Sequence, residues 1–174
     1  MAPTNFVRIF RVLNEAEVRY VLVGGLAAVL HGVDRLTADI DLVIDLTPGE
    51  AEKAIRALTG AGLRANIPVD PLGFADPDTR RAWVADKGMR VLSFWDPAGG
   101  APVVDLFAEH PVDFEGLWAR AEVVDLGGVT CPLASREDLI AIKEAAGRDA
   151  DRADAERLRD LQQGKEGDHD RSDD

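Results

Sequence analysis

Apolar residues in the first part of the chain repeat first at helical and then at strand spacing. Within residues 5–16 they recur every three or four positions, which predicts an amphipathic helix. Residues 20–23 form a short apolar run that stops at Gly24-Gly25, as is typical of a buried strand. The alanine-rich stretch 26–30 predicts a short helix that ends at His31-Gly32. The pattern therefore predicts a strand, a glycine turn and a short helix in succession.

A second strand and a longer helix are expected after a polar connector. Residues 39–44 (DIDLVI) alternate between polar and apolar before turning apolar, which indicates a strand. A helix follows, with Thr47 as its cap and Glu50 completing a capping box. We expect this helix to end at about Gly60 or Gly62, because glycine is a common helix stop.

The remainder of the chain combines strands and helices with loops that proline and glycine mark. Residues 64–88 are mainly loop, with one short helix at 77–86. The other expected elements are strands at 90–95 and 102–107, a short helix at 111–121, a small hairpin at 122–125 and 129–131, a helical region from Ser135 that Gly147 bends or breaks, and a second helix taking in 153–161. These elements predict one domain over 1–163, with a core at about 18–131, C-terminal helices at about 135–163 and a disordered acidic tail at 164–174.

The acidic composition limits the class of partner. The chain has 174 residues and a formal net charge of −12, so most of its surface repels a phosphate backbone. One cysteine, Cys131, excludes an intramolecular disulfide, and the sequence contains neither a signal-peptide pattern nor an apolar run long enough to span a membrane. These features predict a cytoplasmic protein with no membrane association. A nucleic-acid substrate would need a local basic patch, for which the candidates are Arg80, Arg81, Lys87 and Arg90.

Asp39 and Asp41 form the first candidate site. Side chains at i and i+2 of a strand point to the same face, so the two carboxylates lie side by side and repel each other. Paired acids are common at a solvated strand edge, but apolar residues 42–44 follow at once and indicate a central strand. A divalent cation relieves the repulsion, and Mg²⁺ prefers carboxylates together with substrate phosphates. A calcium loop of the EF-hand type is rejected, because Ile44 occupies the position that requires glycine.

Two other features bear on the same chemistry. Asp105 lies in an apolar strand and needs a partner, either an arginine or the same metal pair. A third carboxylate on a neighbouring strand is a usual way to hold two ions for an in-line phosphoryl displacement. Gly24-Gly25 lies between a strand and a helix, where glycine lets the backbone approach an anion. By itself, a glycine pair at this position favours a tight turn without a ligand.

The C-terminal helices carry a cluster of charged residues. On a continuous helix Lys143 and Asp154 are eleven residues apart, which places them on one face. By pattern alone, such a cluster favours a solvated, salt-bridged helix face. The cluster consists of Lys143, Arg148, Asp149, Asp151 and Asp154.

The combination of these features resembles a known family. A hydrophobic strand, Gly24-Gly25, a short helix ending in His-Gly and the motif RLTADIDLV (residues 35–43) are similar to the nucleotidyltransferase superfamily that includes DNA polymerase β. More closely, the chain resembles the small bacterial and archaeal nucleotidyltransferase-like proteins related to the AbiEii toxins. The segment SREDLIAIKEAAGRDADRAD resembles the C-terminal lysine-arginine-aspartate motif of that group. The resemblance covers residues from about 18 to 161.

The resemblance implies an α/β (α+β) fold, namely a mixed β-sheet nucleotidyltransferase fold with flanking helices and a C-terminal helical segment. It implies that Asp39, Asp41 and Asp105 are catalytic and bind two Mg²⁺ (or Mn²⁺) ions. Many members of the wider superfamily have Gly-Ser where this chain has Gly24-Gly25, so here only backbone N–H groups face the phosphates. Asp149, Asp151 and Asp154 can each fill the acidic positions of the C-terminal motif, and the last two are favoured. The implied nucleotide-binding residues are Gly24, Gly25, Arg35, Thr37, Lys143, Arg148, Asp151 and Asp154.

The implied reaction is transfer of a nucleoside monophosphate from an NTP to an acceptor hydroxyl by two-metal phosphoryl transfer. The acceptor is a protein, a tRNA or a small molecule, and the acidic surface favours a protein or a small molecule over tRNA. A toxin role with an antitoxin protein as partner is a further expectation. The alternative is a catalytically inactive protein of the same fold that binds a nucleotide or a partner protein.

Overall fold

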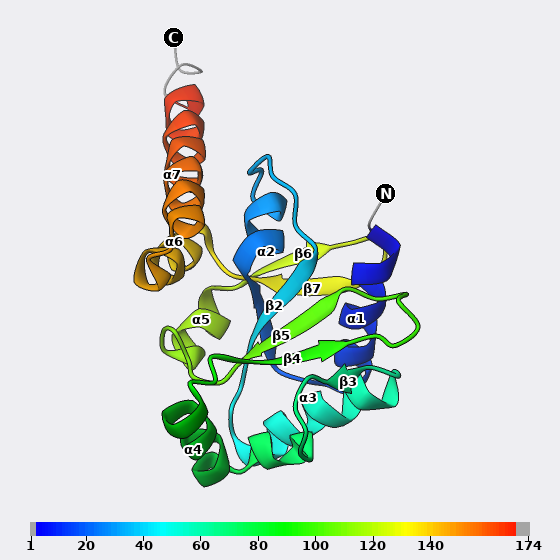
Figure 1. Cartoon of the computed structure of the whole chain (residues 1–174). Coiled ribbons are helices and arrows are strands. Elements are labelled where there is room, and N and C mark those ends of the chain that lie inside the picture. Colours follow the sequence, from blue (N-terminus) through cyan, green and yellow to red (C-terminus); the bar gives the residue numbers. More distant parts are fainter. Residues whose placement is uncertain (1–2, 170–174) are drawn as a thin grey trace.

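A single mixed β-sheet organises the chain (Figure 1). The computed structural model describes residues 3–169, with side chains described for 5–164. Within this part of the chain seven strands pair in the order β3-β4-β5-β2-β1-β7-β6. The central strands β1 and β2 are antiparallel, whereas β2 and β5 are parallel. The strands are β1 (Tyr20–Val23), β2 (Asp39–Ile44), β3 (Arg64–Ala65), β4 (Val91–Trp95), β5 (Val103–Phe107), β6 (Glu122–Asp125) and β7 (Thr130–Leu133).

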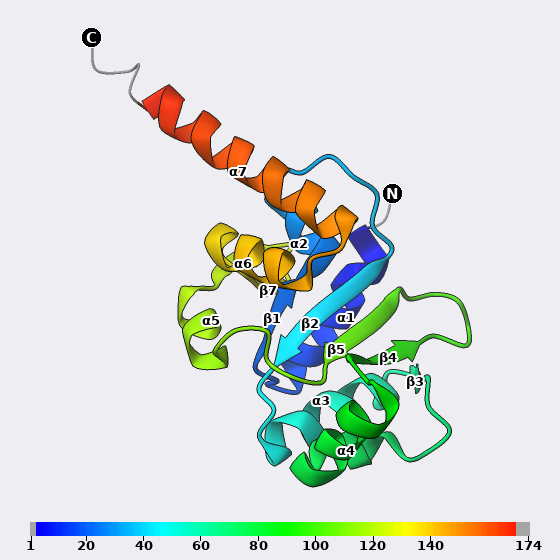
Figure 2. The same cartoon turned by 60° about the vertical axis from the view of Figure 1, so that its left-hand side comes forward.

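Helices flank this sheet and confirm the predicted α/β architecture with a C-terminal helical segment (Figures 1 and 2). They are α1 (Pro3–Glu15), α2 (Gly24–Leu30), α3 (Pro48–Gly60), the 3-10 helix η1 (Pro71–Ala75), α4 (Pro77–Lys87), α5 (Phe114–Arg120), α6 (Arg136–Ala146) and α7 (Asp149–His169). In the described part of the chain, no helix is both long enough and apolar enough to cross a membrane.

The two faces of the central strands have different roles. Tyr20 and Leu22 of β1 pair with Ile44 and Leu42 of β2, and all four side chains are buried. Tyr20 stacks on Phe10 of α1 with ring centroids 6.2 Å apart, so α1 covers this face. Because side chains alternate along a strand, the odd-numbered residues of β2 lie on the opposite face. That opposite face carries the acids of the DxD motif.

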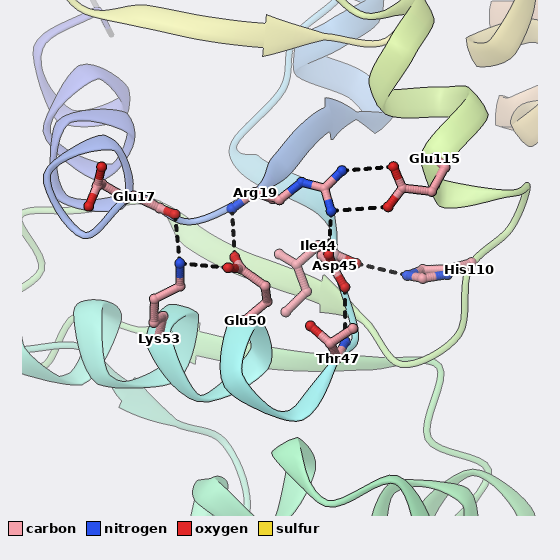
Figure 3. A network of polar contacts seen from close by, with 9 residues as sticks. All are labelled: Glu17, Arg19, Ile44, Asp45, Thr47, Glu50, Lys53, His110 and Glu115. Atoms are coloured by element: carbon pink, nitrogen blue, oxygen red, sulfur yellow. Dashed lines mark hydrogen bonds and ion pairs between the residues drawn. The ribbon is translucent and has the colours of Figure 1, made fainter.

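The start of α3 differs from the predicted capping box (Figure 3). Thr47 occupies the cap position, but its side chain accepts no capping hydrogen bond. The Glu50 carboxylate instead accepts a hydrogen bond from the backbone N–H of Arg19 at 3.1 Å and pairs with Lys53 at 2.6 Å. Asp45 accepts from the backbone N–H of Thr47 at 3.0 Å. The predicted capping box was wrong because the Glu50 carboxylate, which the box requires, binds Arg19 and Lys53 instead.

Several segments also differ from the expected loops between residues 64 and 88. The two-residue strand β3 pairs with β4, and η1 precedes α4. A strand of two residues is too short to show an alternation in the sequence. Two of the four candidates for a basic patch, Arg80 and Arg81, are engaged within the fold. Arg80 is buried and donates to the backbone oxygens of Phe74 and Leu46, and Arg81 pairs with Asp78.

The C-terminal helices start as predicted and extend farther than predicted. Ser135 caps α6 by accepting from the N–H of Asp138, and Gly147 ends it in a left-handed conformation. The second helix, α7, begins at Asp149 because acidic residues in its first turn suit the helix dipole. It continues past Gly164 to His169, where disorder was expected, because helix propagation does not require apolar residues once a helix has formed. Residues 170–174 of the expected tail lie outside the described residues.

Neighbouring contacts place this C-terminal segment beside the sheet. Helix α6 packs against α2, and α7 packs against α6. Both cartoons show α7 leaving the body of the domain beyond this contact (Figures 1 and 2). The base of α7 is therefore the part that can take part in a site at the sheet.

Candidate active site

The structure brings the three predicted catalytic carboxylates onto one face of two neighbouring central strands. Asp39 and Asp41 share a face of β2 because they are two residues apart. Asp105 of β5 is the direct register partner of Asp41, so its side chain lies on that face as well. On the other side, Asp41 pairs with Val23, the last residue of β1 before the glycine turn. The carboxylates therefore meet beside the glycine turn.

The ionised forms of these carboxylates are disfavoured by burial and by their mutual repulsion. Burial raises the pKa of Asp41 to about 6, and the charges of Asp105 and Asp39 add to this shift. The hydrogen bond from the Gly25 N–H and the charge of Lys143 act in the opposite direction and do not cancel it. Burial also raises the pKa of Asp105, with a further contribution from Asp39. A site that concentrates negative charge in this way suits a cationic ligand.

Ser93 is a site residue that the sequence analysis missed. It lies on β4 in register with Asp105, and its hydroxyl donates to Oδ1 of that carboxylate at 2.5 Å. This hydrogen bond lowers the pKa of Asp105 and opposes the effect of burial. The only sequence signal is a serine in the otherwise apolar strand 91–95. The signal has no meaning until the strand register places Ser93 opposite Asp105.

The predicted glycine turn is in direct contact with the DxD motif. Gly24 has a φ of +72°, and a Cβ atom built there would lie 2.0 Å from Oδ2 of Asp41. At Gly25 a Cβ atom would lie 2.8 Å from Oγ1 of Thr37. Both the backbone conformation and the space thus require glycine at position 24. In the same turn, the Asp41 carboxylate accepts a hydrogen bond from the backbone N–H of Gly25.

The charged cluster of the C-terminal helices is buried rather than solvated, which corrects the helix-face interpretation. Lys143 is 4% exposed and Asp154 is 2% exposed. The Lys143 ammonium donates to Asp154 at 2.8 Å and lies 3.9 Å from Asp151. Arg35, from the connector before β2, also pairs with Asp154. Burial alone would raise the pKa of Asp154, but the hydrogen bonds and charges of Lys143 and Arg35 outweigh it and lower the pKa.

Within the acidic motif, the structure distinguishes the three aspartates. Asp151 accepts from Nε of Arg148 at 2.6 Å and is buried, as is Asp154. The Asp149 side chain is fully exposed and forms an ion pair with Arg152 on the surface of α7. The two aspartates favoured from the sequence are therefore the two that point into the network. The reason is the helical repeat, which places positions 151 and 154 on the face of α7 that meets α6.

This cationic network lies close enough to the carboxylates to interact with them. The charge of Lys143 lowers the pKa of Asp41. The pKa of Arg148 is raised, mainly by its hydrogen bond to Asp151 and also by the charge of Asp41. The predicted nucleotide-binding residues from the C-terminal motif are therefore brought beside the DxD motif. Arg35 and Thr37 join the two, because they contact Asp154 and Gly25 respectively.

The donor set of the acidic face fits a hard divalent cation. Carboxylate oxygens are the ligands that Mg²⁺ prefers, and the mutual repulsion of Asp39, Asp41 and Asp105 disappears when a cation lies among them. Among residues 3–169 no three Asp, Glu, His or Cys side chains converge into a ready-made metal-binding group. The three carboxylates are therefore suitable ligands for a divalent cation, although their side chains do not converge on one point.

Comparison with known proteins identifies a family and a similar fold. The family model described as nucleotidyl transferase AbiEii toxin, type IV TA system, matches residues 8–162. No curated protein matches the chain significantly. Among solved structures, the crystal structure of an antigenic nucleotidyltransferase-like protein from Paracoccidioides brasiliensis is similar, with a TM-score of 0.53 and 17% identity over 91% of this chain and 74% of that one. The solution structure of the antibiotic-resistance factor ANT(2'')-Ia has a TM-score of 0.45 and 15% identity, over 94% and 91% of the two chains. The first of these structures confirms the predicted nucleotidyltransferase fold.

Proposed function

This chain belongs to the AbiEii nucleotidyltransferase toxin family, and we propose that its acidic face transfers a nucleoside monophosphate from an NTP to an acceptor hydroxyl. One observation carries the proposal. Asp39, Asp41 and Asp105 lie on one face of adjacent central strands, and burial and mutual repulsion raise the pKa of the last two. Such a group of carboxylates costs stability, so its presence favours a functional role.

The same three residues are the proposed ligands of Mg²⁺ or Mn²⁺. When bound, the cation supplies positive charge that offsets the carboxylates and the substrate triphosphate. The residues of this chain then have separate roles. The Gly24-Gly25 turn lets the backbone approach the phosphates while the Gly25 N–H donates to Asp41, and the charge of Lys143 attracts the phosphates. Arg148, whose side chain is exposed beyond its pair with Asp151, adds a second cation at the same edge.

The bond changes of the proposed reaction are those of a direct displacement. The acceptor oxygen forms a bond to the α-phosphorus, the bond from this phosphorus to the bridging oxygen breaks, and pyrophosphate leaves with the electron pair. The hydroxyl proton passes to Oδ2 of Asp105, because Ser93 already donates to Oδ1. Ser93 therefore orients the carboxylate that receives the proton.

The family description supports a toxin role as well. We infer that the modification of the acceptor harms the cell and that an antitoxin counteracts it. Expression of the wild-type chain should arrest growth of a host strain, whereas Asp41→Asn should be harmless at equal protein level. Growth arrest by Asp41→Asn would show that the toxicity does not depend on the acidic face.

Label transfer tests the proposed reaction directly. The purified chain is incubated with each α-labelled NTP, Mg²⁺ and a cell extract, beside Asp41→Asn and the matched control Asp86→Asn. Asp86 is an exposed aspartate of α4, a helix that packs against η1. We expect transfer in the wild type and the control, and a loss of about 10³-fold in Asp41→Asn, since a metal ligand supplies several kcal/mol of transition-state stabilisation. Equal silence of all three proteins, with NTP still bound, would favour the non-catalytic binding module instead.

A further inference from the structure

The end of the sheet next to Asp105 leaves one of its faces open to solvent. Beyond β5 the sheet continues through β4 to β3 at its edge (Figure 2). The even-numbered residues of β4 and β5 are completely buried, namely Leu92, Phe94, Val104 and Leu106. The odd-numbered residues of both strands all remain partly or largely exposed. Because side chains alternate along a strand, these odd-numbered residues share one face, which is the face that carries Asp105.

Trp95 is an exposed aromatic residue on this open face. It is 44% exposed and is the one aromatic residue among the exposed large apolar side chains of the described residues. It lies two residues beyond Ser93 on β4, so both side chains point to the same face. Since Ser93 is the register partner of Asp105, Trp95 is a diagonal neighbour of Asp105, at a distance of about 7–8 Å. An exposed aromatic ring beside the carboxylates of a site marks a binding surface.

The two sides of the acidic face have different neighbours. On the β1 side, the glycine turn and Lys143 act on Asp41, and this is the side proposed for the phosphates. On the β4 side, Ser93 donates to Asp105, which receives the proton of the acceptor in the proposed reaction. Trp95 follows Ser93 on that same strand. It therefore lies on the side of the acceptor rather than on the side of the triphosphate.

We propose that Trp95 binds the acceptor by stacking on a planar ring that carries the reacting hydroxyl, so that the acceptor is a phenol. This inference rests on the proposed function. The phenol belongs either to a tyrosine of a protein or to a free small molecule. Its oxygen forms a bond to the α-phosphorus and its proton passes to Asp105. The bond from this phosphorus to the bridging oxygen breaks, and pyrophosphate leaves with the electron pair.

The closeness of Trp95 and Asp105 favours a hydroxyl that is attached directly to the stacked ring. Diagonal neighbours on one face are within reach of a single aromatic ligand, because long side chains can already touch over this separation. A phenol stacked on Trp95 can thus direct its oxygen to Asp105, whereas the hydroxyls of a nucleoside are several bonds away from its base. A phenol also has a pKa of about 10, against about 15.7 for water, so it releases its proton more readily.

The charges at this end of the sheet disfavour a nucleic acid as the source of the ring. The chain has a net charge of −12, which repels a polyanion over most of its surface. The register places one cation, Arg64 of β3, opposite Trp95. A groove for a nucleic-acid strand needs a row of cations beside its stacking residues. Arg80 and Arg81 do not supply this row, since backbone oxygens and Asp78 engage them.

Three substitutions test the role of the Trp95 ring. Trp95→Ala removes the ring from a partly exposed position, and Trp95→Phe keeps a smaller ring that can still stack. Val123→Ala is the matched control, because Val123 is an exposed apolar residue of β6, at the opposite edge of the same sheet. Circular dichroism and thermal melting establish that each variant is folded.

The first measurement detects binding without catalysis and uses N-acetyltyrosinamide, an uncharged phenol, as the probe. In nitrogen-15 NMR spectra, the indole N–H signal of Trp95 is identified by its loss in Trp95→Phe. We expect this signal to shift when the probe is added, while the indole signals of Trp83 and Trp118 stay in place. An unchanged Trp95 signal at saturating probe would overturn the stacking role, whether or not the protein transfers a nucleotide.

The second measurement is label transfer from an α-labelled NTP to N-acetyltyrosinamide, with N-acetylserinamide as the alkyl hydroxyl for comparison. We expect transfer to the phenol only. The KM for the phenol should be at least about tenfold higher in Trp95→Ala, intermediate in Trp95→Phe and unchanged in Val123→Ala. The KM for the NTP should stay within about threefold in all variants, because Trp95 lies away from the phosphates. An unchanged KM for the phenol in Trp95→Ala would overturn the proposal.

A cell extract then identifies the source of the phenol. Label on tyrosine residues of the protein fraction indicates a protein acceptor, and label on a phenol in the small-molecule fraction indicates a free one. Label on RNA, or on serine or threonine, would overturn the phenol proposal and leave the proposed function intact. Absence of transfer to any acceptor by the wild type would overturn both.

Discussion

Two aspartates four residues apart, Asp41 of β2 and Asp45 directly after this strand, have opposite environments. Asp41 lies beside the glycine turn, and burial together with the neighbouring carboxylates raises its pKa to about 6. Asp45, just beyond the other end of the strand, is also buried, yet its pKa is lowered. Burial raises the pKa of Asp45 as well, but the N–H and hydroxyl of Thr47 and the charge of Arg19 outweigh it. The difference between the two acids is their partners, since burial acts on both.

The cluster around Arg19 shows what a satisfied group of charges looks like in this protein (Figure 3). The Arg19 guanidinium donates to Asp45 at 2.6 Å and to both carboxylate oxygens of Glu115 at 3.0 and 2.9 Å. It also lies over the rings of Phe114 and Trp118, 5.3 and 5.2 Å from their centroids. This cluster ties β1, β2 and α5 together, so its charges serve the fold. Among the described residues, no arginine or lysine forms an ion pair with Asp39, Asp41 or Asp105, and their charge is available to a ligand.

The largest expected effect is on catalysis, and it separates the two ends of β2. Asp41→Asn should lower the rate of label transfer by about 10³-fold because the carboxylate faces the reacting groups. Asp45→Asn should change the rate per folded molecule by less than about fivefold, since it acts on the fold rather than on the substrate. Initial rates at a temperature where both variants are folded measure this difference. Comparable losses in the two variants would remove the functional distinction between the acids.

A second prediction concerns the glycine that touches Asp41. Gly24→Ala should lower label transfer by at least about 10²-fold, because the new Cβ displaces the Asp41 carboxylate and a small misplacement of a catalytic group is costly. Gly62→Ala is the matched control, since Gly62 also has a positive φ but has open space around its Cβ position. It should lose stability by about 1 kcal/mol and keep its activity. Equal activity of the two alanine variants would show that close packing at Gly24 is not needed.

A third prediction concerns the stability that Arg19 provides. Arg19→Met should lower the free energy of unfolding by about 2–3 kcal/mol, because it leaves Asp45 buried without its cation. Arg56→Met is the control, since Arg56 forms an exposed pair with Glu52 on α3 and should change stability by less than about 0.5 kcal/mol. Urea unfolding at pH 7 measures both. A cost for Arg19→Met no larger than that for Arg56→Met would mean that the cluster does not stabilise the fold.

The smallest expected effect is a pH-dependent gain of stability at the acidic face. The pKa of Asp41 is about 6 in the folded protein against an ordinary value of 3.8, so ionised Asp41 destabilises the fold above pH 6. Asp41→Asn should therefore be more stable than the wild type by about 1–3 kcal/mol at pH 8. The gain should shrink as the pH falls through 6 and vanish below 3.8, where both states are protonated.

Asp45→Asn should change the free energy of unfolding in the opposite direction to Asp41→Asn. Because its folded pKa is lowered, ionised Asp45 stabilises the fold above its ordinary pKa, and the variant should be less stable than the wild type at pH 8. That loss should disappear only as the pH falls through the lowered pKa. Urea unfolding at pH 8, 6 and 4 measures both variants. A loss of stability in Asp41→Asn at pH 8 would show that the carboxylate cluster is not strained.

Much of the candidate site could be predicted because it depends on local spacing. The alternation in residues 39–44 places Asp39 and Asp41 on one face in any strand, whatever the rest of the chain does. Gly24, directly after β1, indicates a turn, and the structure gives it a positive φ. Ser135 caps its helix through a neighbour three residues away. Each of these depends on residues that are close in the sequence.

Features that depend on distant segments were missed or misread. Ser93 becomes a partner of Asp105 only through the register of β4 with β5. The expected capping box failed because Arg19, from another element, binds Glu50. By pattern alone the charged cluster around Lys143 favoured a solvated helix face, whereas Lys143 is buried because α7 packs against α6. None of these contacts leaves a periodic pattern in the residues that make it.

The sequence by itself determined which residues can carry the chemistry, since strand alternation and turn geometry are properties of a few consecutive residues. The tertiary structure alone decided how those residues are charged. Asp41 and Asp45 are the same amino acid, four positions apart, one within β2 and the other directly after it. One meets two other carboxylates and the other meets Arg19, because segments far apart in the chain come together at the two ends of the strand. Charge–charge energies depend on distances in space, and only the folded chain sets those distances.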